Sequence, residues 1–276
     1  MNSSSLFRAA ACVAATAFVV SCSSSKPPIE SIDVVCKRKF DDAKKDYTKG
    51  RDPEAQTKLR DVTVSCAQFE YAEEAQYMLA QSHFRIEQWL EAETEFGILA
   101  GNWERTKYRE EALWKVARSA WNQAPTWDRD PSLIQKAIER EESFLGEFPK
   151  GVRSDSARAD MNDLVTRMAN RRFETARLYM KMGEPQAATI YFHLLFKEYP
   201  DSDRLPLARL QLARAYSELE QFDRAQENLD SLQLDSLRAK PLSKDLQQAR
   251  KDLDKSRRKF EARKAREAAE SRQEKL

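Results

Sequence analysis

Apolar residues recur every three or four positions along most of the chain, which is the period of an amphipathic α-helix. Turns interrupt this pattern and divide it into consecutive pairs of helices. In the second helix of each pair, a small alanine follows soon after the turn. The clearest examples are QWLEAETEFGIL (88–99), IQKAIEREESFLGEFP (134–149), PQAATIYFHLLFKEYP (185–200) and QFDRAQENLDSL (221–232). The pattern predicts an all-α chain built from helical hairpins.

The alanines of these second helices have partners in the first helices. Ala55, Ala92, Ala188 and Ala225 each follow another alanine by twelve residues, whereas Ala137 is paired with Ala117 across an insertion at 121–131. Small side chains let two antiparallel helices cross closely. This pattern resembles the tetratricopeptide repeat, whose hairpins stack into a solenoid. We expect about five repeats over residues 31–238, with the first the least typical.

The N-terminus has the form of a secretory signal. A polar start with Arg8 precedes twelve largely apolar residues, 9–20, too few for the roughly 20 that span a bilayer. The following Val-Val-Ser-Cys resembles the bacterial lipobox, which implies removal of residues 1–21 and a covalent lipid on Cys22. Residues 22–30 would then be a lipidated tether. The alternative is an ordinary signal with a chance cysteine.

The composition argues against several classes of function. Charged residues make up 33% of the chain but nearly cancel to a net charge of +2, so no strong field favours nucleic acid. We find no catalytic constellation, phosphate-binding glycine loop or metal-ligand spacing, and predict neither an enzyme nor a cofactor beyond the lipid.

Cys36 and Cys66 fall where the ends of the first hairpin meet, which predicts a disulfide, with two free thiols as the alternative.

Two longer segments carry a family resemblance. RMANRRFETARLYMKMGEPQAATIYFHLLFKEYPDS (167–202) continues into LARLQLARAYSELEQFDRAQENLDSL (207–232), and DRDPSLIQKAIEREESFLGEFPKG (128–151) precedes them. Together with the lipobox and the irregular repeat lengths, these segments resemble the BamD family, lipoproteins of the outer-membrane β-barrel assembly machine. The resemblance covers about residues 22–236.

The resemblance implies a lipid-anchored scaffold on the periplasmic face of the outer membrane. Its C-terminal repeats would dock on the POTRA-type periplasmic domains of the barrel-inserting subunit. Its N-terminal repeats would meet the C-terminal signal of unfolded outer-membrane proteins, and other assembly lipoproteins are further candidate partners. In the family, a basic residue on the second helix of repeat four pairs with an acidic residue of the barrel-inserting subunit. The equivalent position here is Tyr191, which cannot form that salt bridge. We therefore expect docking contacts through Tyr191 and Lys197. The alternative function is an envelope adaptor that organises peptidoglycan enzymes or proteases.

A peptide-binding groove is a further hypothesis. In peptide-binding repeats, certain positions of the first helix face the groove. Counted from Ala80 and Ala117, these positions hold four aromatic residues here. Each of the two repeats contributes two of them, seven positions apart on one helix face. These rings would take aromatic side chains, and the polar groups would take the peptide backbone and carboxylate. The alternative is that some of the rings belong to the core. The expected residues are Tyr77, Gln81, Phe84, Arg85, Trp114, Arg118, Trp121 and Asn122.

The C-terminal segment, residues 239–276, is rich in charge of both signs. Leu246, Leu253 and Phe260 are seven residues apart and form a thin apolar stripe on a predicted helix. This pattern fits two structures. The segment is either a solvated helix that projects from the last repeat, or a helix that docks on a partner through the stripe and its basic face.

Overall fold

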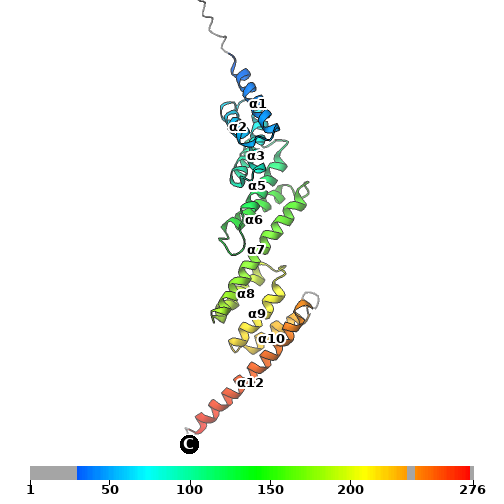
Figure 1. The fold of residues 1–276 in the computed structure, drawn as a ribbon. Coiled ribbons are helices and arrows are strands. Elements are labelled where there is room, and N and C mark those ends of the chain that lie inside the picture. The colour runs from blue at the N-terminus through cyan, green and yellow to red at the C-terminus, as the bar shows by residue number, and fades with distance from the viewer. Residues whose placement is uncertain (1–29, 235–239, 274–276) are drawn as a thin grey trace, which may run out of the picture.

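The computed structural model describes residues 30–234 and 240–273, in which all the regular secondary structure is helical. The helices stack in chain order into an elongated body, with α1 near one end and α12 at the other (Figure 1). The expected signal segment, the lipidation site Cys22 and all but the last residue of the tether lie outside the described residues. The helices are α1 (Ile32–Thr48), α2 (Asp52–Ser65), α3 (Ala72–Arg85), α4 (Trp89–Asn102), α5 (Arg109–Gln123), α6 (Ser132–Glu147), α7 (Ser154–Lys181), α8 (Pro185–Glu198), α9 (Leu205–Glu218), α10 (Phe222–Leu234), η1 (Lys240–Leu242) and α12 (Ser243–Gln273).

Within the described residues, α1 to α10 pair into the five hairpins that the alanine spacing predicts, and the second helix of each of the first four hairpins also packs on the first helix of the next. The predicted all-α repeat fold is therefore confirmed. Large apolar side chains fill the spaces around these crossings, with Phe96, Phe144 and Phe192 at most 1% exposed. The paired alanines are at most 3% exposed: Ala43, Ala55, Ala80, Ala92, Ala117, Ala137, Ala176, Ala188, Ala213 and Ala225.

Four of these hairpins reverse direction through one residue with left-handed backbone. The residue is Gly50 (φ 71°), Glu87 (φ 62°), Gly183 (φ 75°) or Glu220 (φ 59°). Glycine adopts this conformation without steric cost, whereas other residues lose roughly 1–2 kcal/mol. The recurrence of the turn at two glutamates shows that the packing of the two helices, more than the turn residue itself, fixes the reversal.

The hairpin α5/α6 differs because a longer loop joins its helices. Two arginines of α7 hold this loop by its backbone carbonyl groups. Arg167 donates to the carbonyl oxygen of Ala124 at 2.8 Å, and Arg171 donates to that of Arg129 at 2.6 Å. The loop at 124–131 therefore lies against α7, whose 28-residue length provides the surface that holds it.

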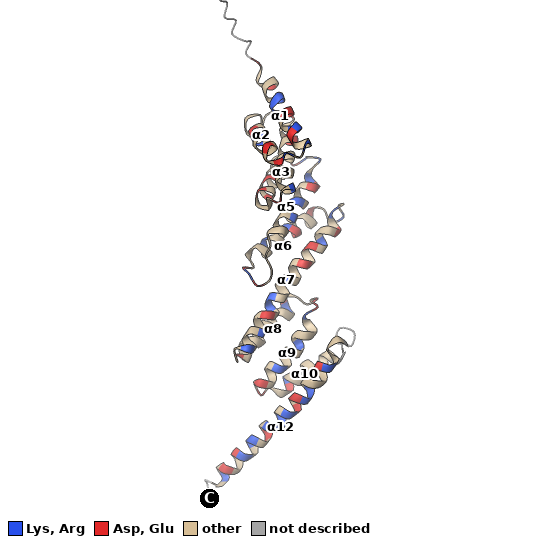
Figure 2. Cartoon of the chain, viewed as in Figure 1, with Lys and Arg blue, Asp and Glu red and all other residues tan. Residues whose placement is uncertain are grey.

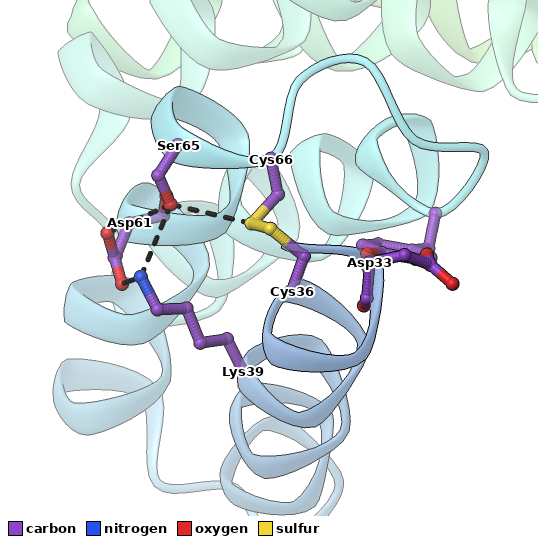
Figure 3. Close-up of a disulfide and its surroundings, with 7 residues drawn as sticks. Asp33, Cys36, Lys39, Asp61, Ser65 and Cys66 are labelled. Atoms are coloured by element: carbon purple, nitrogen blue, oxygen red, sulfur yellow. Dashed lines mark hydrogen bonds and ion pairs between the residues drawn. A yellow bond between two sulfur atoms is a disulfide. The ribbon is translucent and has the colours of Figure 1, made fainter. Parts of the chain in front are cut away.

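A disulfide closes the first hairpin. Cys36 in the second turn of α1 and Cys66 at the end of α2 are bonded, with a Cα–Cα distance of 5.7 Å (Figure 3). Both residues are buried in a cluster with Phe40 and Leu59. On the surface beside the bond, Lys39 of α1 pairs with Asp61 of α2 at 2.9 Å. A covalent link thus joins the two ends of a hairpin that has only two aromatic residues, Phe40 and Tyr47.

The C-terminal helix corrects part of the prediction for residues 239–276. Its apolar stripe is occupied by the chain's own last repeat, because Ala249 and Leu253 are buried against α9 and α10, with Leu246 and Phe260 packed beside them. The solenoid therefore continues past the expected boundary at 238/239. Beyond Phe260 the side chains of α12 are exposed as far as the description extends, and acidic and basic residues are interspersed along it (Figure 2). Three ion pairs fasten α12 to the last hairpin: Arg250–Asp230 (2.7 Å), Arg257–Asp223 (2.8 Å) and Arg263–Glu220 (2.6 Å).

The disulfide predicts a local loss of stability when it is removed. Closing a segment of 30 residues restricts the unfolded chain and contributes roughly 3–4 kcal/mol in the chain-entropy view. We expect the Cys36→Ala, Cys66→Ala variant to lower the opening free energy of α1 and α2 by about this amount in hydrogen exchange, while α9 and α10 change little. Reduced wild-type protein should behave like the variant. Equal protection of α1 in oxidised wild type and variant would contradict a stabilising role for the disulfide.

Candidate functional site

The eight side chains expected to line a groove come from α3 and α5, the first helices of repeats two and three. None of these eight side chains is fully buried in the core. Arg85 is exposed and the other seven are half-buried. We call this surface the α3–α5 face; it consists of Tyr77, Gln81, Phe84 and Arg85 from α3, and Trp114, Arg118, Trp121 and Asn122 from α5.

Contacts between rings hold Tyr77 and Phe84 of α3 in place. Tyr77 stacks on Tyr108 with ring centroids 4.1 Å apart, and its hydroxyl donates to Glu111 Oε2 at 3.1 Å. Burial, followed by the charge of Glu111, raises the pKa of Tyr77 above its ordinary value. Phe84 meets Phe96 edge to face at 6.3 Å. The two rings are thus fixed before any ligand arrives.

Guanidinium groups cover both tryptophans of α5. Arg153 lies over Trp114, with its Cζ 4.6 Å from the ring centroid. Arg118 lies over Trp121 at 4.1 Å, and the indole Nε1 of Trp121 donates to Asp163 Oδ2 at 3.0 Å. Trp121 is therefore tied to α7, whereas the Nε1 of Trp114 is buried without a hydrogen-bond partner among the described residues.

The two arginines of the predicted groove are already paired with carboxylates from neighbouring helices. Arg85 donates through Nε to Asp52 Oδ1 at 3.0 Å and stacks on the Tyr47 ring at 4.1 Å. Arg118 forms an ion pair with Asp160 of α7. These partners lie 33 and 42 residues away along the chain. Neither guanidinium is a free positive charge.

The remaining two polar residues of the face differ from each other. Asn122 is engaged within its own helix, because its Nδ2 donates to the carbonyl oxygen of Arg118 at 2.9 Å. The Oε1 of Gln81 is buried and has no hydrogen-bond partner among the described residues. Gln81 thus retains an acceptor that a ligand could satisfy.

Lys115 adjoins two residues of this face, Trp114 and Phe84, and the sequence did not indicate it. Its side chain is buried, at 6% exposure, between Trp114 and the rings of α3 and α4. The ammonium Nζ lies 3.6 Å from the Phe84 centroid, 5.6 Å from that of Trp114 and 5.9 Å from that of Phe96. Burial lowers the pKa of Lys115 to about 8, opposed by Glu111 and assisted by the nearby Arg153 charge. A lysine beside a tryptophan in a helix gives no sequence signal that distinguishes it from a solvated one.

A buried carboxyl group lies behind Arg118. Glu141 of α6 is fully buried, and neither of its carboxyl oxygens has a hydrogen-bond partner among the described residues. Burial raises the pKa of Glu141 to about 8. The negative charge of Asp160 raises it further, and the positive charge of Arg118 acts in the opposite direction. Glu141 is thus mostly protonated at neutral pH, which leaves Arg118 paired with Asp160.

The two residues expected to dock a partner both lie on α8. Tyr191 stacks on Tyr179 of α7 with centroids 5.2 Å apart, and Lys197 is exposed. Six residues along an α-helix correspond to a rotation of roughly 240°, so Tyr191 and Lys197 do not share one face of α8. Close to the stacked tyrosines in sequence, α7 and α8 carry exposed apolar residues: Leu178 (56% exposed), Met182 (63%) and Ile190 (57%).

The sequence model of the YfiO family, described as "Outer membrane lipoprotein", matches residues 33–232. The chain belongs to the YfiO family. YfiO is the sequence model of the BamD family, so this match confirms the resemblance to that family inferred from the sequence. The matched segment contains the Cys36–Cys66 pair, the α3–α5 face and Tyr191, and ends before α12 begins. No curated protein matches the chain.

Several solved structures of repeat proteins are similar to this YfiO-family chain. A Podosopora anserina kinesin light chain with nearly identical TPR-like repeats is 20% identical, with a TM-score of 0.33, covering 77% of this chain and 99% of that one. The TPR2AB domain of yeast Sti1 in its pHSP90 complex is 13% identical, with a TM-score of 0.40, covering 82% and 98%. A thermophilic TPR protein from Thermus thermophilus is 17% identical, with a TM-score of 0.32, covering 80% and 98%.

Two sizeable hollows lie away from the α3–α5 face. One, of about 700 Å³, is lined by the start of α10 and by Arg257 and Phe260 of α12. The other, of about 550 Å³, lies between α4 and α6. No cluster of three or more metal-ligating side chains occurs in the described part of the chain. Within the same part, no helix combines the length and apolar character needed to cross a bilayer.

The raised pKa of Glu141 predicts a pH-dependent stability. The Glu141 carboxyl ionises near pH 4.5 in the unfolded chain but near pH 8 in the folded protein. Its contribution to the free energy of unfolding is therefore most favourable below pH 4.5 and declines as the pH rises towards 8. We expect Glu141→Gln to match wild type near pH 4.5 and to exceed its unfolding free energy by on the order of 2–4 kcal/mol at pH 8.5. Denaturant titrations of both proteins across this pH range test the prediction. The control is Glu142→Gln, which makes the same change at the exposed neighbouring residue. A constant difference between Glu141→Gln and wild type would contradict it.

Proposed function

We propose that this chain is a lipid-anchored scaffold on the periplasmic face of the outer membrane, within the machinery that assembles β-barrel proteins. Membership of the YfiO family across all five hairpins is the observation that carries this proposal. Binding is the chemistry that the structure favours. The α3–α5 face offers rings and buried polar atoms fixed on rigid helices, which suits recognition of another chain.

The α3–α5 face is the proposed site for unfolded outer-membrane proteins. An unfolded client offers an extended backbone with alternating side chains, and some of these are aromatic. Tyr77, Phe84 and Trp114 present three rings across two adjacent helices, and their positions are fixed by the contacts described above. A surface that is ordered in advance reduces the entropy lost on binding, so that a short peptide segment can be held.

Repeats four and five are the proposed docking site for the barrel-inserting subunit, which carries POTRA-type periplasmic domains. Tyr179 and Tyr191 stack on each other, and their neighbours in sequence Leu178, Met182 and Ile190 each expose more than half of their surface. Apolar side chains gathered in this way mark protein interfaces more often than solvated surface. Aromatic residues at such a position also contribute a large share of binding energy. The contact would therefore be apolar and aromatic, with no salt bridge at Tyr191.

The lipid on Cys22 would place the N-terminal repeats near the membrane. The start of α1 at Ile32 is ten positions after Cys22, and an extended chain of that length spans at most about 33–36 Å. The start of repeat one would then stay close to the membrane surface, and we propose that the elongated stack extends away from it towards repeats four and five (Figure 1). This arrangement suits a scaffold that presents clients near the bilayer and holds the insertion machinery through its other end.

Co-purification from gently solubilised host membranes tests the docking proposal. We expect Tyr191→Glu to reduce recovery of a large β-barrel subunit with repeated periplasmic domains by at least about tenfold, because placing a charge in an apolar interface costs roughly 2 kcal/mol or more. The control is Gln135→Glu, which adds the same charge at an exposed position of α6. Melting curves should show that both variants remain folded.

Two results would count against this function. Unchanged recovery of the barrel subunit with Tyr191→Glu would exclude the proposed docking surface. Recovery of peptidoglycan enzymes or proteases without any barrel subunit would instead favour an envelope adaptor built on the same repeat fold.

A further inference from the structure

The end of repeat one that carries the disulfide exposes large apolar side chains. Ile32 (60% exposed) and Val34 (51%) lie in the first turn of α1, and Val64 (77%) lies in the last turn of α2. Nothing in the described part of the chain covers them. Apolar side chains that are exposed together mark contacts with proteins or membranes more often than solvated surface.

Two bonds hold the segments that carry these side chains at the same end of the hairpin. The Cys36–Cys66 disulfide joins the start of α1 to the end of α2 (Figure 3). In the loop after α2, the hydroxyl of Tyr71 donates to the carbonyl oxygen of Asp33 in the first turn of α1 at 3.5 Å. The same loop carries Phe69, which is half-buried and stacks on Tyr71 with ring centroids 5.6 Å apart. We call this surface the α1–α2 end; it consists of Ile32, Val34, Val64 and Phe69.

The charged residues at the α1–α2 end largely neutralise one another. Three consecutive basic residues of α1 each pair with a carboxylate: Lys37–Asp41 (2.7 Å), Arg38–Glu30 (2.8 Å) and Lys39–Asp61 (2.9 Å). The exposed Asp33 adds one negative charge. No net positive charge therefore remains to attract an acidic partner, and a contact at this end would depend on the apolar side chains.

The place of this end in the chain favours a phospholipid surface as its occupant. Ile32 is ten positions after Cys22, so a lipid on Cys22 keeps the α1–α2 end within about 33–36 Å of the bilayer. Tethering at such a distance raises the effective concentration of the membrane around this end. An apolar contact that is too weak to form from free solution is then populated, whereas a diffusing protein partner has no such advantage.

We propose that the α1–α2 end rests on the periplasmic surface of the bilayer, with Ile32, Val34 and Val64 at the boundary between headgroups and acyl chains. Apolar side chains at the surface of a protein bind membranes at this depth. The inference rests on the proposed lipid anchor at Cys22 and adds a second, non-covalent contact. A tether alone lets the body rotate about its attachment, whereas this contact would fix the direction in which the stack leaves the membrane.

Fluorescence quenching in vesicles tests the inference with full-length protein purified from host membranes. The protein is reconstituted into phosphatidylcholine vesicles with an environment-sensitive fluorescent amino acid in place of Val64. Lipids with bromine atoms on the acyl chains near the headgroups quench the probe on contact, and we expect at least about twofold loss of fluorescence. The matched control places the same probe at Val152, which is 89% exposed in the turn before α7.

Two double variants separate the apolar side chains from the tether. With the probe at position 64, Ile32→Gln, Val34→Gln should reduce quenching to the level of the control probe. Leu90→Gln, Ile98→Gln also replaces two exposed apolar side chains, on α4, and should leave the quenching unchanged. Raising the salt concentration to roughly 0.5 M should change little, because salt screens charges and does not weaken apolar contacts. Melting curves should show that both variants remain folded, since the replaced side chains are exposed.

Flotation of the vesicles separates failure of the contact from failure of the anchor. Absence of quenching in protein that floats with the vesicles would overturn the contact and leave the lipid anchor intact. Protein that does not float would overturn the anchor at Cys22, and the contact with it. Equal quenching of the probes at positions 64 and 152 would mean that the body lies along the bilayer, which would overturn the assignment to the α1–α2 end. Quenching that survives in Ile32→Gln, Val34→Gln, or that salt abolishes, would overturn the apolar contact.

Discussion

The close crossing of two helices at a pair of alanines is the constraint on which the structure depends. A larger side chain at either position would push the helices apart, and each hairpin packs on the next, so the error would propagate along the stack. The alanine at position 80 or 117 also determines which residues of α3 and α5 turn away from the core. The rings of Tyr77 and Trp114 are only half-buried because their neighbours Ala80 and Ala117 occupy the crossing itself.

The sequence predicted this architecture well because the signal is local. Alanines twelve residues apart and the turns between them are both visible within one hairpin. Contacts between hairpins were not predicted in the same way. Arg85 and Arg118 looked like free polar groups of a groove, and their partners Asp52 and Asp160 belong to neighbouring repeats. Lys115 gave no signal at all, since its burial depends on rings from α3 and α4.

The C-terminal helix is a second case in which the sequence did not predict a contact between segments. A stripe with a period of seven predicts an apolar face on a helix but does not identify what covers it. Here α9 and α10 cover it, and ion pairs along α12 fix its position. The expected tail is therefore partly a capping helix of the solenoid, and only the part beyond Arg263 projects from the body.

The two ends of the solenoid are thus completed by different means. A terminal repeat lacks one neighbour and buries less apolar surface than an internal repeat. The first repeat compensates with a disulfide, and the last with a helix from the following segment. Between these ends, buried acidic residues link the hairpins, as where Glu93 of α4 accepts from Gln123 of α5 and pairs with Lys136 and Arg140 of α6. Such links resist sliding of one hairpin past another. A stack stiffened in this way keeps a client-binding face and a docking face at a fixed separation, as a scaffold between two partners requires.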